Sequence, residues 1–239
     1  MQLYDFDDPI PDLSFENAVK AIHGEFEQDW RQRRSAIARL MRAFRKNDQA
    51  LRALIRQHVG GGQWPIMRGT QSFYLYESKQ FRMRANLWFP ASHPLAGQAG
   101  YRDFLTIEKC HNHDFSFFSI CVLGSGYTTR MYGAKDYAQT LQVGERVILE
   151  PECTFGLNGD TVMYVERDLD FHSQLFPETL SVTVNLIPAR EMRRSVQYSV
   201  DEENGTIERK IHTDAGASLP DRPWSLPNET NSATAFVDS

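Results

Sequence analysis

The sequence predicts a mainly β protein, a barrel or jelly roll preceded by a helical segment, and three observations support this prediction. Hydrophobic residues follow a helical period over residues 14–58. A glycine run at 60–62 ends that pattern. From residue 73 to 187, short strand-like runs follow one another, separated by tight turns. Antiparallel strands with such connections are typical of barrels and jelly rolls rather than alternating strand–helix units.

The helical segment is predicted from apolar residues that recur every three or four positions. Ser14 directly precedes the first of them and is a suitable N-terminal cap. We expect two or three helices within residues 1–60, and we expect this segment to pack on the barrel. The periodic residues are Phe15, Val19, Ile22, Phe26, Ile37, Leu40, Met41, Phe44, Leu51, Leu54 and Ile55.

The barrel is expected to occupy residues 61–200. Phe81, Met83, Ala85, Leu87 and Phe89 alternate with more polar residues, as in a half-buried strand. Other runs of this kind cover 73–78, 114–123, 127–132, 146–149, 161–165 and 180–187. Residues 201–239 are polar and punctuated by proline, so we expect a flexible tail there.

Composition and charge limit the classes of function. The net charge of −5 and the pI near 5.8 argue against nucleic-acid binding, and the arginines between residues 31 and 56 fit a solvated helix face. The N-terminal sequence lacks the features of a signal peptide, and no apolar run is long enough to span a membrane. We therefore expect a cytoplasmic protein. The three cysteines lack CxxC spacing and are expected to be reduced.

Three histidines form the candidate metal site. His111 and His113 are two residues apart, so in a strand their side chains would project to the same side. His172 lies just before an apparent turn and the strand-like run 180–187, and an antiparallel barrel can bring such a distant residue beside the pair. Three neutral imidazoles suit iron(II), although zinc, copper, nickel and manganese remain open.

The spacing of these residues resembles the cupin superfamily. His111-x-His113, followed after three residues by Phe117 and after six more by Gly124, matches the first cupin motif. A looser second motif covers 144–151 and His172. The resemblance spans about residues 73–188 and implies a cupin-type double-stranded β-helix. Cupins usually have a ligand glutamate at the position of Phe117, so the resemblance implies a site of three histidines alone.

Within the cupins, the arrangement is most similar to the thiol dioxygenases, such as cysteine dioxygenase. That resemblance implies iron(II), a thiolate and dioxygen, and an arginine on an earlier strand that binds the substrate carboxylate. Arg82 and Arg84 lie on such a strand, although their alternation with apolar residues also fits a solvent-facing position. Phe118 stands at the position of the family's cysteine of the cysteine–tyrosine crosslink, which therefore cannot form. Tyr198 or Tyr164 is a candidate for hydrogen bonding to oxygen.

Several carboxylates lie near the proposed ligands in the sequence. Asp114, Asp168 and Asp170 are candidates to accept hydrogen bonds from the imidazoles, with solvated loop positions as the alternative. Glu108 is the weakest candidate for a fourth ligand, because it requires a bulge in the strand.

Three functions follow in order of preference. The first is an iron(II)-dependent oxygenase or dioxygenase acting on a small thiol or amino-acid derivative. The second is a 2-oxoglutarate-dependent iron oxygenase, which needs a carboxylate ligand that His113 does not provide. The third is a non-catalytic cupin that binds a metal or small ligand. The expected partners are a small-molecule substrate and dioxygen, without nucleic acid or membrane, and a homodimer is left open.

Overall fold

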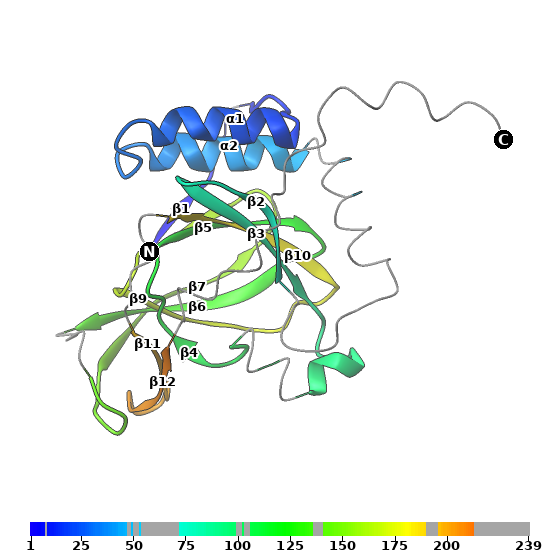
Figure 1. Cartoon of the computed structure of the whole chain (residues 1–239). Helices are drawn as coiled ribbons and strands as arrows, with labels where there is room; N and C mark the ends of the chain where they lie inside the picture. Colours follow the sequence, from blue (N-terminus) through cyan, green and yellow to red (C-terminus); the bar gives the residue numbers. More distant parts are fainter. Residues whose placement is uncertain are drawn as a thin grey trace.

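Two antiparallel sheets of six strands each face one another in the computed structural model, and two helices cover the outer surface of one sheet (Figure 1). The structure describes residues 1–7, 9–46, 72–98, 106–135, 141–189 and 196–212, together with positions 49, 53 and 102. This arrangement is a mainly β sandwich with an N-terminal helical segment, so the predicted mainly β class is confirmed.

The sheet beneath the helices is called the covered sheet, and the other is called the open sheet. The covered sheet has the order β1 (Gln2–Tyr4), β8 (Val162–Val165), β5 (Phe117–Leu123), β10 (Ser181–Pro188), β3 (Phe81–Trp88) and β2 (Ser72–Glu77). The open sheet has the order β12 (Ile207–His212), β11 (Val196–Val200), β4 (Cys110–His111), β9 (Asp170–Gln174), β6 (Tyr127–Lys135) and β7 (Ile148–Leu157). A short 3-10 helix, η1, covers Pro94–Gly97.

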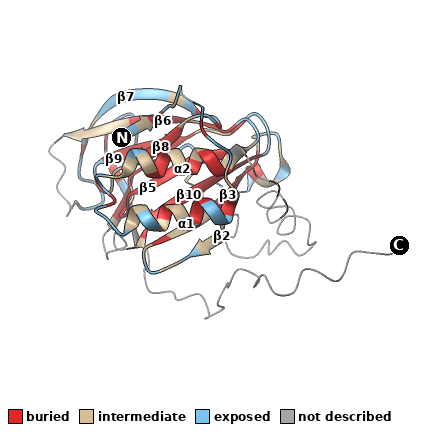
Figure 2. Ribbon diagram, turned by 90° about the horizontal axis from the view of Figure 1, so that it is seen from above, coloured by how far each residue is buried: buried red, intermediate tan, exposed pale blue. Residues whose placement is uncertain are grey.

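Helices α1 (Phe15–Phe26) and α2 (Arg34–Lys46) form the N-terminal layer. The predicted cap is confirmed, because the Ser14 side chain accepts a hydrogen bond from the backbone N–H of Asn17. Ile22, Ile37 and Phe44 are fully buried against the covered sheet. The inward faces of both helices are buried, whereas β7 at the far edge of the open sheet is largely exposed (Figure 2). A third predicted helix, around Leu51, lies outside the described residues.

Side-chain alternation in the covered sheet divides its residues between two environments. Met83, Ala85 and Leu87 of β3 pack beneath the helices, as do Val184 and Leu186 of β10. Because successive side chains of a strand point to opposite faces, the residues between them point into the space between the two sheets. That interior space is the place where a ligand site can form.

The arginines of α2 serve mainly to attach the helix. Arg34 pairs with Glu166 at 3.3 Å, while Arg42 and Arg45 both pair with Asp160 in the turn between β7 and β8, at 3.5 and 3.3 Å. These contacts agree with the interpretation of the arginine-rich segment as a helix face rather than a nucleic-acid patch.

The structure also extends beyond several predicted boundaries. Strands β1, β4, β9, β11 and β12 were not predicted as separate strands. β12 lies within the segment expected to be a tail, because fully buried Ile207 packs with Val147 and Tyr198 and thereby continues the open sheet past residue 200. All three cysteines are free. Among the described residues, no helix is long and apolar enough to cross a membrane.

Candidate metal centre

The open sheet brings the three predicted histidines together. His111 on β4 lies directly opposite His172 on β9, and His113 follows two residues later in the chain. One ring nitrogen of each can be chosen such that all three atoms lie within 4.8 Å of one another. His111 and His172 are buried and His113 is half-buried. The predicted set of three histidines is therefore a single buried cluster.

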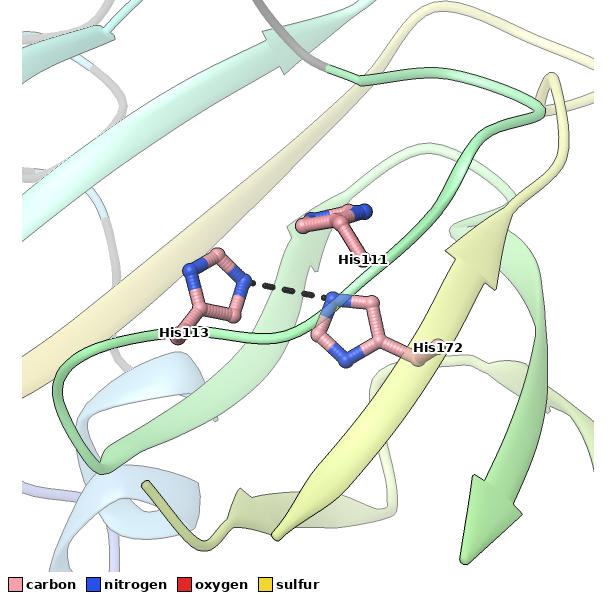
Figure 3. A group of neighbouring side chains, drawn as sticks. All are labelled: His111, His113 and His172. Carbon is pink, nitrogen blue, oxygen red and sulfur yellow. Dashed lines mark hydrogen bonds between the residues drawn. The ribbon is translucent and has the colours of Figure 1, made fainter. Parts of the chain in front are cut away.

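The spacing of the rings fits ligands of one metal ion. The imidazoles surround a common space (Figure 3), and their centroids are 4.9 Å apart for His111 and His113, 4.6 Å for His111 and His172, and 5.0 Å for His113 and His172. With metal–nitrogen distances of about 2.1 Å, each centroid would lie about 3.2 Å from the ion, and three ligands at angles between about 90° and 109° would have centroids about 4.5 to 5.2 Å apart. The observed separations lie within that range.

The nitrogens of His113 and His172 support the same conclusion. Their Nε2 atoms are 3.2 Å apart and point toward each other (Figure 3). If an ion lay about 2.1 Å from both nitrogens, the nitrogen–metal–nitrogen angle would be about 100°. This value lies between the angles of octahedral and tetrahedral geometry. Both Nδ1 atoms are buried and have no hydrogen-bond partner within the described ranges. The Nε2 atoms of His113 and His172 are therefore close enough to bind one ion together.

Burial keeps the three imidazoles neutral. It lowers the pKa of His111 to about 4, although the Lys109 carbonyl partly opposes this shift. The pKa values of His113 and His172 are well below the usual value, first because of burial. A proton on either ring would also be repelled by a proton on His111, and for His113 by a proton on His172 and by the charge of Arg84. Since a histidine must be neutral to bind a metal, all three are ready to do so at neutral pH.

The orientation of His111 is set by neighbouring backbone and a hydroxyl. Its Nδ1 lies 2.9 Å from the carbonyl oxygen of Lys109, so this nitrogen donates and Nε2 has the free electron pair. The hydroxyl of Thr106 lies 2.9 Å from that Nε2. Neither partner could be recognised from the sequence. A backbone carbonyl leaves no signature in the residue types, and Thr106 lies outside the HxH pattern.

The three carboxylates considered as hydrogen-bond acceptors for the imidazoles bind other groups in the structure. Asp114 accepts a hydrogen bond from Gln197, Asp168 pairs with Arg167, and Asp170 pairs with the amino group of Met1. Asp168 still contributes through its backbone, whose N–H donates to the carbonyl of His113 at 2.9 Å.

Asn112 anchors the backbone between two of the histidines. Its N–H donates to the Tyr198 carbonyl at 3.2 Å, and its side-chain oxygen accepts from the Tyr198 N–H at 2.8 Å. Asn112 is fully buried. The amide side chain thus replaces a backbone group in the pairing with β11 and keeps His113 aligned after β4 has ended.

The wall next to the imidazoles is aromatic. The ring of Phe117 lies 5.0 Å from that of His113 and 6.2 Å from that of His172, and Phe115 lies 4.9 Å from His113. Within the described ranges the cluster contains three histidines and no carboxylate. Glu108 is exposed and pairs with Arg102.

The structure separates the two candidate arginines. Arg82 pairs with Glu77 at 2.6 Å and lies over the ring of Tyr74. Arg84 faces the interior between Met83 and Ala85, and its Nε is buried without a hydrogen-bond partner in the described part of the chain. Burial lowers the pKa of Arg84, which nevertheless stays charged, and its charge lowers the pKa of His113. Of these two arginines, Arg84 is the one whose Nε lies buried in the interior without an acidic partner in the described part of the chain.

The candidate tyrosines lie away from the cluster. Tyr198 packs with Cys110 and Phe171, whose side chains lie on the face of the open sheet opposite His111 and His172. Tyr164 packs against Trp30 and Phe118 on the helix side, and its hydroxyl donates to Glu166. Neither hydroxyl faces the imidazoles.

Comparisons with known proteins assign no activity to this chain. Protein-family models give no match, and curated protein sequences give none. Among solved structures, the chain is similar to DMSP lyase DddQ from Ruegeria pomeroyi DSS-3, with 10% identity and a TM-score of 0.32 over 72% of this chain and 91% of that one. It is also similar to the 7S globulin of Momordica charantia, with 9% identity and a TM-score of 0.27 over 56% of this chain and 37% of that one. Similarity at this level identifies neither a family nor a substrate.

Proposed function

We propose that the protein is an iron(II)-dependent oxygenase, most simply a dioxygenase, whose substrate is a small thiol or amino-acid derivative with a carboxylate. One observation supports this above all: an interior-facing arginine, Arg84, whose buried Nε has no hydrogen-bond partner in the described part of the chain, lies near three neutral imidazoles. This combination provides a metal site and an anion site within one enclosed interior.

The imidazoles would hold the ion. His111, His113 and His172 would each supply one ring nitrogen as a ligand. Iron(II) held there would supply open coordination positions at which a thiol and dioxygen can react. The neutral ligand set leaves the ion its full positive charge, which favours an anionic thiolate as the additional ligand.

Arg84 would orient the substrate. A guanidinium can bind both oxygens of a carboxylate through two parallel hydrogen bonds, which fixes direction as well as position. Its charge in a partly desolvated interior also favours an anion over a neutral molecule.

Phe115 and Phe117 would restrict water near the ligands. Their rings lie against His113, so the space beside the imidazoles is apolar on that side. Exclusion of water strengthens the charge interactions and limits side reactions of oxidising species.

Oxygen consumption tests the proposal. Iron-loaded protein should consume dioxygen with a small mercapto acid, and Arg84→Leu should raise KM far more than Arg82→Leu, the matched control on the same strand. Oxygen uptake that requires 2-oxoglutarate would replace this proposal with the second function considered from the sequence. A stoichiometric iron complex that consumes no oxygen with any mercapto acid or amino acid would overturn the oxygenase assignment.

A further inference from the structure

Two asparagines lie beside Arg84 on the interior face of the covered sheet. Asn86 lies two residues after Arg84 on β3 and therefore faces the same side of the sheet. Its neighbours Ala85 and Leu87 face the other side and pack beneath the helices. Asn185 on β10 is the direct cross-strand partner of Arg84. Asn86 and Asn185 are only 2% and 7% exposed. Two amides are therefore buried in the same interior as the guanidinium.

Neighbouring serines orient both amides. The hydroxyl of Ser119 on β5 donates to Oδ1 of Asn185 at 2.8 Å, and the hydroxyl of Ser72 on β2 donates to Oδ1 of Asn86. Because each amide oxygen already accepts a hydrogen bond, the Nδ2 group of each asparagine is the side left to face a ligand. The serines thus fix which half of each amide is presented.

One donor of this group is buried without an acceptor. Within the described ranges, the Nε of Arg84 has no hydrogen-bond partner. A buried donor without a partner is costly, so it is expected where a bound ligand accepts its hydrogen bond. Directly opposite residues in a sheet have Cβ atoms about 5 Å apart, so one small acidic group can reach Arg84 and Asn185 together.

The interior beyond Asn86 is filled, which limits the size of a ligand. The rings of Trp88 and Tyr127 lie 4.5 Å apart, and the indole N–H of Trp88 donates to Thr183 at 2.9 Å. Trp88 is the next interior-facing residue of β3 after Asn86. A ligand on the asparagines is therefore confined between this aromatic pair and the imidazoles.

We propose that Asn185 and Asn86 determine substrate specificity, by donating hydrogen bonds to the oxygens of the acidic group that Arg84 attracts. The inference rests on the proposed function and extends it: Arg84 supplies charge, while the two amides select a group that only accepts hydrogen bonds. A carboxylate accepts at every donor. A carboxamide of the same size would turn an NH2 group toward them and leave donors unpaired.

Equilibrium binding separates this inference from the proposed reaction. The probes are mercaptoacetate and mercaptoacetamide, which share a thiol and differ only in the acidic group, titrated calorimetrically without oxygen into the cobalt(II)-loaded full-length protein. The variants are Asn185→Leu and Asn86→Leu, which remove the amide at similar volume, and Asn185→Asp, which replaces it with a charge. Asn17→Leu, at an exposed position on α1, is the matched control.

We expect the wild type to prefer mercaptoacetate, and each leucine variant to lose about tenfold or more in affinity for it, while the affinity for mercaptoacetamide changes less than about threefold. Asn185→Asp should abolish the preference. Cobalt affinity should be the same in every variant, because none is a metal ligand.

The results assign failure to one proposal or the other. The specificity inference is overturned if the wild type binds both probes with equal affinity, or binds neither. It is also overturned if the leucine variants lose affinity equally for both probes. The expected preference in a protein that consumes no oxygen with iron would overturn only the oxygenase proposal and leave the donor residues established.

Discussion

His111 and His172 are cross-strand partners in the single pairing that joins β4 to β9. Directly opposite side chains on one face of an antiparallel pair lie close together without any side-chain contact to hold them. The distance between two of the three imidazoles is therefore set by the backbone register of the open sheet. His113, which lies beyond the end of β4, depends instead on the Asn112 contacts with β11.

Removal of one histidine should abolish stable metal binding. We expect His172→Ala to weaken iron(II) or cobalt(II) binding more than about 100-fold, because even changes to residues around metal ligands cost about 10–100-fold. Metal content after dialysis, together with cobalt titration, measures the effect. His93→Ala is the control, since His93 stacks on Phe89 and lies outside the cluster. Full metal retention by His172→Ala would rule out the three-histidine centre.

Asn112 should align the metal ligands as well as stabilise the fold. Asn112→Ala removes the acceptor for the Tyr198 N–H, and we expect metal affinity to fall about 10–100-fold. Asn112→Asp keeps an acceptor oxygen and should recover most of the affinity. The cobalt(II) absorption spectrum reports ligand geometry separately from stability. An unchanged spectrum and affinity in Asn112→Ala would mean that this contact serves only the fold.

The metal-free protein should lose stability in mild acid. A histidine has a pKa near 6.5 when unfolded, whereas His111 in the folded protein has a pKa of about 4. Below pH 6.5 the unfolded chain therefore binds more protons than the folded chain, so the free energy of unfolding decreases as the pH is lowered. His111 alone should account for a decrease of up to about 3 kcal/mol by pH 4. Urea unfolding at several pH values measures this slope. His111→Gln should show a shallower slope, and equal slopes in the two proteins would contradict the assignment.

A carboxylate introduced at Phe117 should make folding depend on metal. Phe117 is 2% exposed and lies against His113 and His172. Phe117→Glu would bury a carboxyl group, which we expect to cost several kcal/mol in the metal-free protein. Added manganese or iron(II) should recover most of that loss, because the carboxylate then has a cation. Thermal unfolding with and without metal checks this, and Phe117→Gln is the uncharged control. An equal effect of metal on both variants would show that the glutamate is not a ligand.

Tyr198 should be dispensable for chemistry at the centre. Its side chain packs with Cys110 and Phe171 on the other face of the open sheet. We expect Tyr198→Phe to leave metal affinity and any oxygen consumption within about twofold of the wild type, because hydroxyl removal there changes no group near the imidazoles. A large fall in kcat at unchanged metal affinity would mean that Tyr198 reaches the substrate.

The sequence predicted the histidine cluster better than the strands that position it. An HxH pair and a later histidine are visible as residue types, and the longer runs at β3, β5 and β10 are rich in apolar residues. Strands β4 and β9 contain two and five residues, too few to show a period. They exist because neighbouring strands pair with them, which is information from tertiary structure.

The choice between the two arginines could not be made from sequence. Arg82 and Arg84 have the same side-chain chemistry and the same phase in the alternation of β3. What distinguishes them is the acidic partner: Glu77 on β2 lies opposite Arg82, whereas Tyr74 lies opposite Arg84. A strand pairing with a register shift between Tyr74 and Tyr76 determines this difference, and the sequence does not reveal that shift.

The three imidazoles belong to the open sheet and its following loop, whereas Arg84, Asn86 and Asn185 belong to the covered sheet. The two groups meet only across the sandwich and share no strand. On the proposed function, substitutions on β3 and β10 would change which molecule is accepted without disturbing the ion, and changes around β4 and β9 would alter the ion without changing recognition. Such a division would allow related chains to diversify their substrates while retaining one kind of metal centre.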